Sequence, residues 1–209
     1  MVGRSNVGKS SLINALVRQK VARTSAAPGK TRLANVYRIT RGTAAPFYLV
    51  DLPGYGHTRG GHAAAQEFGA LAQAYFETVR LKTDPTPDRR GVRLQPDRRV
   101  AALLLIDARH PGMTSDRQAW HWLQRAADAV ALVGTKIDKL ARGTRIRAMR
   151  ELESAFEDSV LPVSAVTGEG LDELWKLIDR LANSRAPHRR SKLSSPSPLR
   201  ATAPRLPKK

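Results

Sequence analysis

The segment GRSNVGKS, from Gly3 to Ser10, has the residue types and spacing of a phosphate-binding loop. It fits the pattern G-x-x-x-x-G-K-[ST], in which glycines let backbone N–H groups close around a phosphate. Lys9 would reach the β- and γ-phosphate oxygens, and the Ser10 hydroxyl would ligate Mg²⁺. The alternative is a glycine-rich turn before a helix, which the rarity of the full pattern disfavours. We expect these residues to contact a nucleotide: Gly3, Arg4, Ser5, Asn6, Val7, Gly8, Lys9, Ser10 and Ser11.

A second element, DLPG, begins at Asp51 directly after an apolar run at 47–50. A carboxylate at the end of a strand beside the phosphate loop can hold the Mg²⁺ shell, and the Gly54 N–H can meet the γ-phosphate. Taken alone, D-x-P-G is more often an ordinary turn. Its position after the phosphate loop, with two predicted strands between them, favours the metal-binding interpretation.

The tetrapeptide TKID, which contains Thr135, Lys136 and Asp138, follows another apolar run and predicts the base. The Asp138 carboxylate can accept hydrogen bonds from guanine N1–H and N2–H₂, while Lys136 lays its aliphatic stem along the purine. Adenine has no matching donors, and a buried carboxylate left unpaired is costly. The alternative is a charged helix start without a ligand. Further on, the backbone N–H groups of Ser164 and Ala165 could bind guanine O6.

Apolar runs and amphipathic segments alternate along the chain, and each motif follows an apolar run. The runs predict strands at 36–39, 47–50, 100–106, 129–133 and 160–163. Continuous apolar runs such as 100–106 are typical of strands covered on both faces. The alternation predicts an α/β fold with a mostly parallel sheet, helices on both faces, and ligands at the carboxyl ends of the strands.

The first strand of this predicted sheet is largely missing at the N-terminus, because only Met1 and Val2 precede Gly3. The strand that carries a phosphate loop normally supplies about five or six residues. A gap there would leave the backbone groups of neighbouring strands unpaired. We therefore expect the natural protein to carry an upstream segment that ends in an apolar strand.

Composition limits the class of protein. The chain has 209 residues, 41% of them hydrophobic, which is enough for one domain with a sizeable core. It has no cysteine, no apolar leader and no run near the roughly 18 apolar residues of a membrane span, so we expect a soluble cytoplasmic monomer without a membrane partner. The net charge of +18 favours a polyanionic partner, nucleic acid first. The alternative is a solvated basic surface without a dedicated partner.

The composition also divides the chain into regions. Residues 1–182 form the expected nucleotide-binding domain, within which the proline-rich and basic stretch at 82–99 is interpreted as an irregular surface insertion. Residues 183–209 contain eight arginines and lysines, several prolines and no acidic residue. They have little that could be buried and therefore predict a disordered basic tail.

Taken in order, the motifs resemble one protein family. The segments GRSNVGKSSLINAL, SAAPGKTR, DLPGYG, DARHP followed by Asp116-Arg117, TKID and SAVTGEG are similar to those of the EngB family of bacterial ribosome-assembly GTPases. The resemblance runs from about Gly3 to Leu181, and Thr135 in place of the commoner asparagine is typical of that family. It implies a P-loop NTPase G domain that hydrolyses GTP to GDP as a molecular switch and binds the large ribosomal subunit or its rRNA.

The resemblance also implies roles for residues that the spacing alone does not identify. Thr31, in the segment PGKT, matches a threonine that caps Mg²⁺ and senses the γ-phosphate, and Gly29 becomes a nucleotide contact. Residues 24–34 and 53–61 become the two switch segments, ordered by GTP. Lys9 and Thr31 are the expected catalytic residues. The expected Mg²⁺ ligands are Ser10, Thr31 and Asp51.

Two features depart from the expected pattern, Tyr55 and the stretch 82–99, and Asn6 bears on the first of them. Tyr55 stands where a glutamine often orients the attacking water, which implies slow hydrolysis without an activator. Asn6 is a candidate for holding K⁺, because an asparagine at this place does so in related GTPases; the alternative is a turn or helix-capping residue. The stretch 82–99 is longer than the connection usual in the family, and we assign it no function.

Two other functions are compatible with some of these features. The chain could be another Era-like GTPase acting on tRNA or at a membrane, but it has neither a KH-type G-x-x-G module nor an added membrane segment. It could also be an RNA-binding protein with a weakly active nucleotide site. The intact residues Lys9, Asp51 and Asp138 argue against that function.

Overall fold

The structure is a computed structural model, and it describes residues 1–22, 34–43, 46–55 and 100–183. The described strands are β1 (Val2–Gly3), β2 (Asn35–Ile39), β3 (Phe47–Asp51), β4 (Ala101–Asp107), β5 (Ala129–Thr135) and β6 (Val160–Pro162). The described helices are α1 (Lys9–Val17), α3 (Thr114–Ala126), the 3₁₀ turn η1 (Ile137–Lys139), α4 (Arg142–Phe156) and α5 (Leu171–Asn183). The expected insertion at 82–99 and the tail from 184 onward lie outside the described residues.

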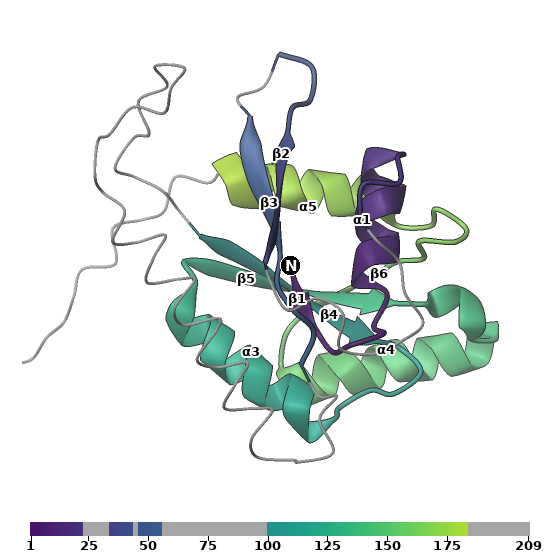
Figure 1. Ribbon diagram of the computed structural model, residues 1–209. Coiled ribbons are helices and arrows are strands. Elements are labelled where there is room, and N and C mark those ends of the chain that lie inside the picture. The colour runs from purple at the N-terminus through teal and green to yellow at the C-terminus, as the bar shows by residue number, and fades with distance from the viewer. Residues whose placement is uncertain (23–33, 44–45, 56–99, 184–209) are drawn as a thin grey trace, which may run out of the picture.

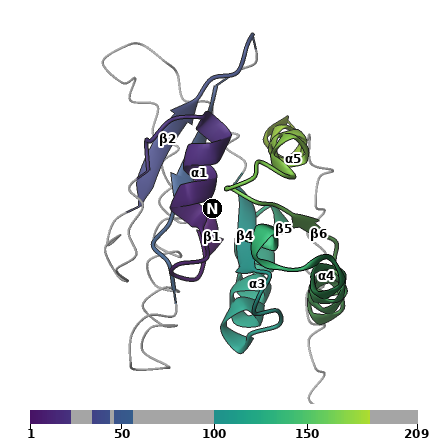
Figure 2. The same ribbon diagram turned by 90° about the vertical axis from the view of Figure 1, so that its right-hand side faces the viewer.

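Four strands form a parallel sheet in the order β1-β4-β5-β6. Helices cover both of its faces: α1 and α5 lie on one side and α3 and α4 on the other (Figures 1 and 2). This confirms the predicted fold class, a mostly parallel α/β sheet between two helical layers. Each of the five strands predicted from apolar runs is present, with ends shifted by one or two residues.

The alternation of side chains along β4 explains its continuous apolar run. Leu104 and Ile106 pack into the core shared with α3 and α4, whereas Leu103 and Leu105 pack into the core shared with α1 and α5. Leu104, Leu105 and Ile106 are fully buried. A strand buried on both faces has no solvent side, and apolar residues are therefore favoured at every position.

The short strand β1 lies between two longer partners. Val2 pairs with Leu104 of β4 on one side. On the other side, the Met1 nitrogen donates to the Val50 oxygen at 2.5 Å, and the Leu52 nitrogen donates to the Met1 oxygen at 3.2 Å. These bonds bring the end of β3 beside the start of the phosphate loop.

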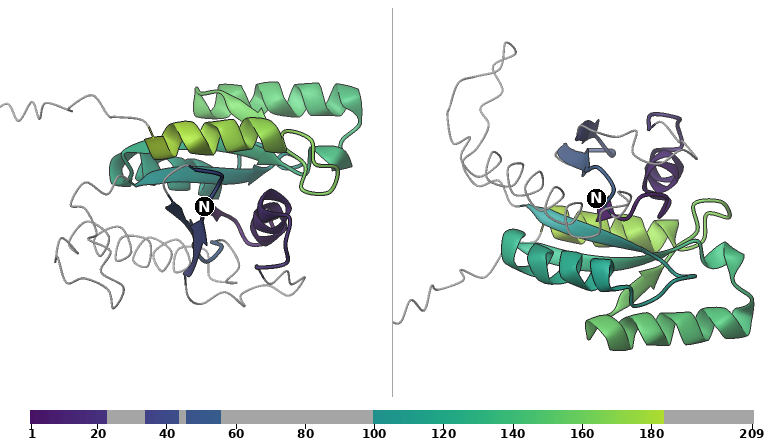
Figure 3. Two further views of the ribbon diagram at one scale, coloured as in Figure 1. Left: turned by 90° about the horizontal axis from the view of Figure 1, so that it is seen from above. Right: turned by 60° about the horizontal axis from the view of Figure 1, so that its bottom comes forward.

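The antiparallel pair β2–β3 forms a second, two-stranded sheet, and the end of β3 meets the four-stranded sheet at Met1, beside β1 (Figure 3). Asn35 at the start of β2 is opposite Asp51 at the end of β3. Within the described part of the chain, no helix combines the length and the apolar character needed to cross a lipid bilayer.

Candidate functional site

The loop from Gly3 to Lys9 leaves β1 and enters α1 (Figure 1). Asn6 and Gly8 both have left-handed backbone conformations, with φ of 62° and 104°. No side chain in the described ranges caps the start of α1, where Gly8 is the N-cap residue. The N–H groups of a first helical turn have no intrahelical partner, so this end of α1 can accept an anion.

Two glycines allow backbone segments to touch around this loop. A Cβ on Gly3 would lie 2.8 Å from the Leu105 oxygen, and a Cβ on Gly54 would lie 2.7 Å from the Ser5 nitrogen. Such distances are shorter than any ordinary contact, so larger residues would displace the loop. The predicted DLPG element therefore packs its backbone directly on the phosphate loop.

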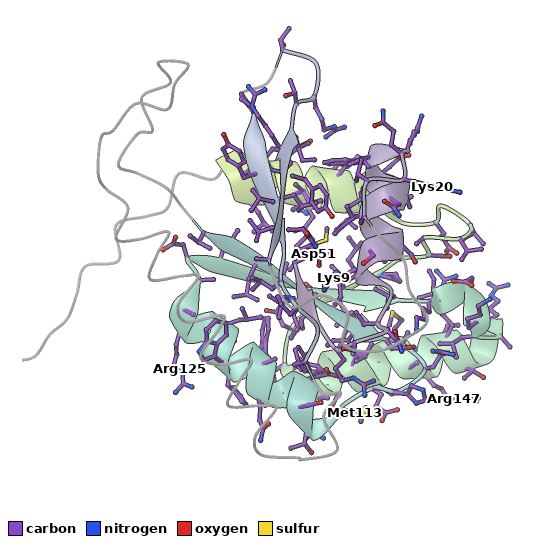
Figure 4. All side chains as sticks on the ribbon, viewed as in Figure 1. Lys9, Lys20, Asp51, Met113, Arg125 and Arg147 are labelled. Atoms are coloured by element: carbon purple, nitrogen blue, oxygen red, sulfur yellow. The ribbon has the colours of Figure 1, made fainter. Side chains whose placement is uncertain are left out.

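Lys9 and Asp51 form a direct ion pair between the start of α1 and the end of β3. Their side chains are only 8% and 2% exposed. Figure 4 shows the two labelled residues together near the centre of the molecule. Each side chain is thus buried with the other as its charged partner, at the place where the sequence predicts a phosphate and a metal ion.

The oxygen donors near this ion pair fit Mg²⁺. Mg²⁺ prefers oxygen ligands and is usually held by one or two protein groups together with phosphates and water. Asp51 supplies a buried carboxylate at the end of β3, and Ser10 supplies a hydroxyl in the first turn of α1. Within the described ranges, no three His, Cys, Asp or Glu side chains form a metal-binding group. The residues present therefore suit a metal ion that phosphate oxygens help to hold.

The TKID tetrapeptide ends β5 and passes into η1. The Thr135 hydroxyl donates to the Val7 oxygen at 2.7 Å, so the end of β5 is hydrogen-bonded to the phosphate loop. Lys136 has a left-handed backbone, with φ of 60°, and its ammonium group donates to the Asn6 oxygen. The Lys136 side chain therefore runs along the phosphate loop, close to Gly8.

Asp107, at the end of β4, holds this lysine in place and was not identified by sequence reasoning. Its carboxylate lies 3.0 Å from the Lys136 nitrogen and accepts two hydrogen bonds from the Arg109 side chain at 2.9 and 2.7 Å. Burial alone would raise the pKa of Asp107, but the hydrogen bonds from Arg109 and Lys136 outweigh it and lower the pKa to about 2. Asp107 is therefore ionised at neutral pH.

Asp138 is oriented by a serine from a distant strand end. The Ser164 hydroxyl donates to the Asp138 carboxylate at 2.8 Å, and Lys139 lies 3.4 Å from its other oxygen. Burial opposes ionisation, yet the hydrogen bond from Ser164 and the charge of Lys139 give Asp138 a lowered pKa. An ionised, fixed carboxylate is a suitable acceptor for two N–H groups of a base.

Ser164 itself is fully buried and links Asp138 to the loop before α5. Its hydroxyl oxygen accepts from the Val166 and Thr167 nitrogens at 3.2 and 3.1 Å. The sequence predicted only backbone contacts for Ser164 and Ala165. The role of the serine side chain was missed, because nothing local in the sequence pairs it with Asp138.

Tyr55, the residue after Gly54, belongs to a buried network that sequence reasoning also missed. Its hydroxyl donates to the Asp116 carboxylate on α3 at 2.7 Å, and the Arg4 nitrogen Nε lies 3.5 Å from the other Asp116 oxygen. Tyr55 is 5% exposed and Asp116 is fully buried. Burial, together with the charge of Asp116, raises the pKa of Tyr55 far above its usual value.

The structure thus gathers most of the predicted residues at the carboxyl ends of the strands. The phosphate loop begins at the end of β1, and Asp51 is the last residue of β3, with Gly54 just beyond it. Thr135 is the last residue of β5, with the rest of TKID after it, and Ser164 and Ala165 follow β6. Gly29 and Thr31, and the second switch segment beyond Tyr55, lie outside the described residues.

A parallel sheet with this loop, a buried acid after β3 and a TKID motif after β5 defines the class: a P-loop GTPase G domain. A family model described as "50S ribosome-binding GTPase" matches residues 1–136. A "Probable GTP-binding protein EngB" of Chlorobaculum parvum is 38% identical over 181 residues, 85% of this chain and 83% of that protein. Its counterpart in Oceanobacillus iheyensis is 36% identical over 185 residues, 86% of this chain and 84% of that protein. The chain belongs to the EngB family of GTP-binding proteins and is a GTPase.

Solved structures agree on the fold. The crystal structure of a probable GTP-binding protein EngB superposes with a TM-score of 0.58 and 20% identity, covering 88% of this chain and 97% of that one. Era in complex with MgGDPNP and a segment of 16S ribosomal RNA gives a TM-score of 0.66 at 24% identity, covering 89% of this chain. The chain spans 56% of the length of that Era chain. At these identities the likeness establishes the fold alone, and the family rests on the sequence matches.

Proposed function

We propose that this GTPase acts as a nucleotide-dependent switch in the assembly of the large ribosomal subunit. The observation that carries the proposal is the match of residues 1–136 to a family model described as a 50S ribosome-binding GTPase. The net charge of +18 agrees with it, because a basic protein is attracted to rRNA at long range. The cytoplasm, where ribosomes assemble, is the corresponding location.

For the phosphates, Lys9 and the loop backbone are the proposed ligands. When GTP enters, its phosphate oxygens replace Asp51 as the partner of Lys9, and Asp51 becomes available to a metal ion. Ser10 and Asp51, with Thr31, would hold Mg²⁺, which supplies positive charge against the charge that develops on the phosphate oxygens. Once GTP is bound, the chain's own contribution is to hold these groups in place, so that little reorganisation is needed in the chemical step.

For the base, Asp138 is the proposed acceptor of guanine N1–H and N2–H₂. Ser164 holds this carboxylate at 2.8 Å, and Lys136 is held between Asn6 and Asp107. The Ala165 N–H would meet guanine O6. The Ser164 N–H, which the sequence also suggested for this contact, donates instead to the Glu169 oxygen at 2.9 Å. A preformed set of acceptors and donors rejects adenine, since adenine would leave the carboxylate unpaired.

Hydrolysis is proposed to be slow without an activator, because Tyr55 offers no amide to orient water. A K⁺ ion held with the help of Asn6 would add positive charge near the phosphates. If so, hydrolysis should be faster in KCl than in NaCl at equal ionic strength, and Asn6→Ala should abolish the difference. Equal rates in the two salts would leave Asn6 with a backbone role in the loop.

Sedimentation of a cell lysate through a sucrose gradient tests the proposed function. With a non-hydrolysable GTP analogue, the protein should travel with the large subunit; with GDP it should stay near the top. Asp138→Asn is the matched control, because it should lose the response to guanine nucleotide without changing the protein's net basic character. A protein that stays at the top under both conditions contradicts the role in large-subunit assembly.

A further inference from the structure

Tyr55 stands where many GTPases carry a glutamine, yet its side chain is committed elsewhere. The ring is 5% exposed, and its hydroxyl donates to Asp116 at 2.7 Å. A phenol held in this way cannot also orient a water molecule at the phosphates. Tyr55 therefore makes a fixed internal contact where a glutamine would supply an amide for catalysis. The surrounding contacts show which residues this contact holds in place.

The backbone around Tyr55 is joined to the phosphate loop at several points. Tyr55 and Arg4 form a parallel β-bridge, and the Ser5 nitrogen donates to the Tyr55 oxygen at 3.0 Å. The Ser5 hydroxyl lies 3.3 Å from the Gly54 oxygen. Gly54 is so close to Ser5 that no Cβ would fit between them. The position of Gly54 is thus set by residues on both sides of it.

Asp116 completes this arrangement from a third element. Its carboxylate, on α3, accepts from Tyr55 with one oxygen and faces Arg4 of the loop with the other, at 2.7 and 3.5 Å. Burial raises the pKa of Asp116, whereas the Tyr55 hydrogen bond and the Arg4 charge oppose that rise. The contact with Arg4 is an ion pair without a hydrogen bond, so this buried carboxylate depends all the more on the hydrogen bond from Tyr55, because an unpaired buried acceptor is costly.

We propose that Tyr55 and Asp116 are positioning residues for γ-phosphate recognition, holding Gly54 against Ser5 so that the Gly54 N–H meets the γ-phosphate. The proposal rests on the GTPase activity of the family and does not depend on the ribosomal role. If it is right, disrupting the network should weaken the affinity for GTP, which has a γ-phosphate, and not the affinity for GDP, which lacks one. A network that only stabilises the fold would affect both nucleotides alike.

The decisive variant is Tyr55→Phe, which removes one hydroxyl and keeps the ring. Affinities for a fluorescent GTP analogue and for fluorescent GDP are measured by titration, together with thermal melts. We expect affinity for the GTP analogue to fall about tenfold, as for loss of one hydrogen bond to a charged group, and GDP affinity to change less than about twofold. Tyr48→Phe, which trims an exposed tyrosine on β3, is the matched control and should change neither affinity.

Asp116→Asn separates the tyrosine contact from the charge. The two single variants and the double variant form a cycle, and we expect the loss of GTP-analogue affinity in the double variant to be no larger than in the worse single variant. If Tyr55→Phe lowers the melting temperature but weakens both nucleotides equally, or leaves both affinities unchanged, the positioning role is wrong. Tyr55→Phe decides this even if Asp116→Asn fails to fold. The ribosomal proposal fails independently, in the sucrose gradient.

Discussion

The half of the site expected to bind phosphate and the half expected to bind the base differ in how their charges are paired. In the phosphate half, Lys9 and Asp51 are buried against each other. In the base half, Asp138 is held by Ser164 and Lys136 by Asp107, none of which is expected to leave when a ligand enters. The base half is therefore preassembled, whereas the phosphate half must exchange partners. Such an exchange is what a switch requires, because it makes the pairing depend on the nucleotide.

The largest effect should come from breaking the phosphate half with Lys9→Met. Asp51 would then be buried without its cation, and we expect the free energy of unfolding of the nucleotide-free protein to fall by about 3–5 kcal/mol. Denaturant unfolding measures this loss. The double variant Lys9→Met with Asp51→Asn should recover part of it, because no unpaired charge remains. A single variant as stable as the double one would mean that the ion pair is not a buried constraint.

Breaking the base half with Asp138→Asn should leave folding intact and change specificity. We expect GTP to bind more weakly by about 3 kcal/mol, roughly a hundredfold, because an amide cannot accept from both guanine donors. Xanthosine nucleotides should bind more tightly to the variant, since xanthine offers a carbonyl, which the amide can donate to, where guanine has an amino group. Competition titrations with both nucleotides measure the change. Unchanged GTP affinity would remove Asp138 from the base site.

A third variant, Asp107→Asn, tests through the pH dependence of stability whether the Asp107 carboxylate holds Lys136 in place. The folded-state pKa of Asp107 is lowered to about 2 from 3.8, so its stabilisation is present above about pH 4 and is lost as the pH falls toward 2. The contribution is at most about 2 kcal/mol and smaller in practice, since Arg109 is 40% exposed and screened by solvent. Unfolding free energies measured across this acidic range should depend less on pH in the variant. If unfolding free energy depends on pH equally in the wild-type protein and the variant, Asp107 does not hold Lys136 through its charge.

The smallest effect is expected for Glu169→Gln, at the rim of the base half. Glu169 accepts from Arg145 at 2.9 Å, but the two side chains are 50% and 28% exposed. Exposed ion pairs contribute little, so we expect no measurable change in unfolding free energy and no change in GTP affinity. A large loss of affinity in a nucleotide titration would show that the loop after Ser164 depends on this surface pair.

The strands and the motif positions were predictable because both have local signatures. Apolar runs such as 100–106 predict buried strands, and the GRSNVGKS spacing is specific to a phosphate loop. Residues joined only by folding were not predictable. Tyr55 and Asp116 are 61 positions apart, and Ser164 and Asp138 are 26 apart. A local sequence pattern is shorter than either separation, so it could not link the members of either pair. Asp107 lies in the segment DARHP that resembles the family, but its contact with Lys136 was not predictable, because Lys136 lies beyond the end of another strand.

A crystal structure of the protein with Mg²⁺ and a non-hydrolysable GTP analogue tests the comparison of the two halves most directly. In that structure we expect Lys9 to have left Asp51 and to contact the β- and γ-phosphate oxygens. We also expect the Ser164 hydroxyl still to donate to Asp138, near the present 2.8 Å, while guanine donates to the same carboxylate. A structure in which nucleotide is bound while Lys9 remains paired with Asp51, or in which the Ser164–Asp138 bond breaks on binding, would contradict it.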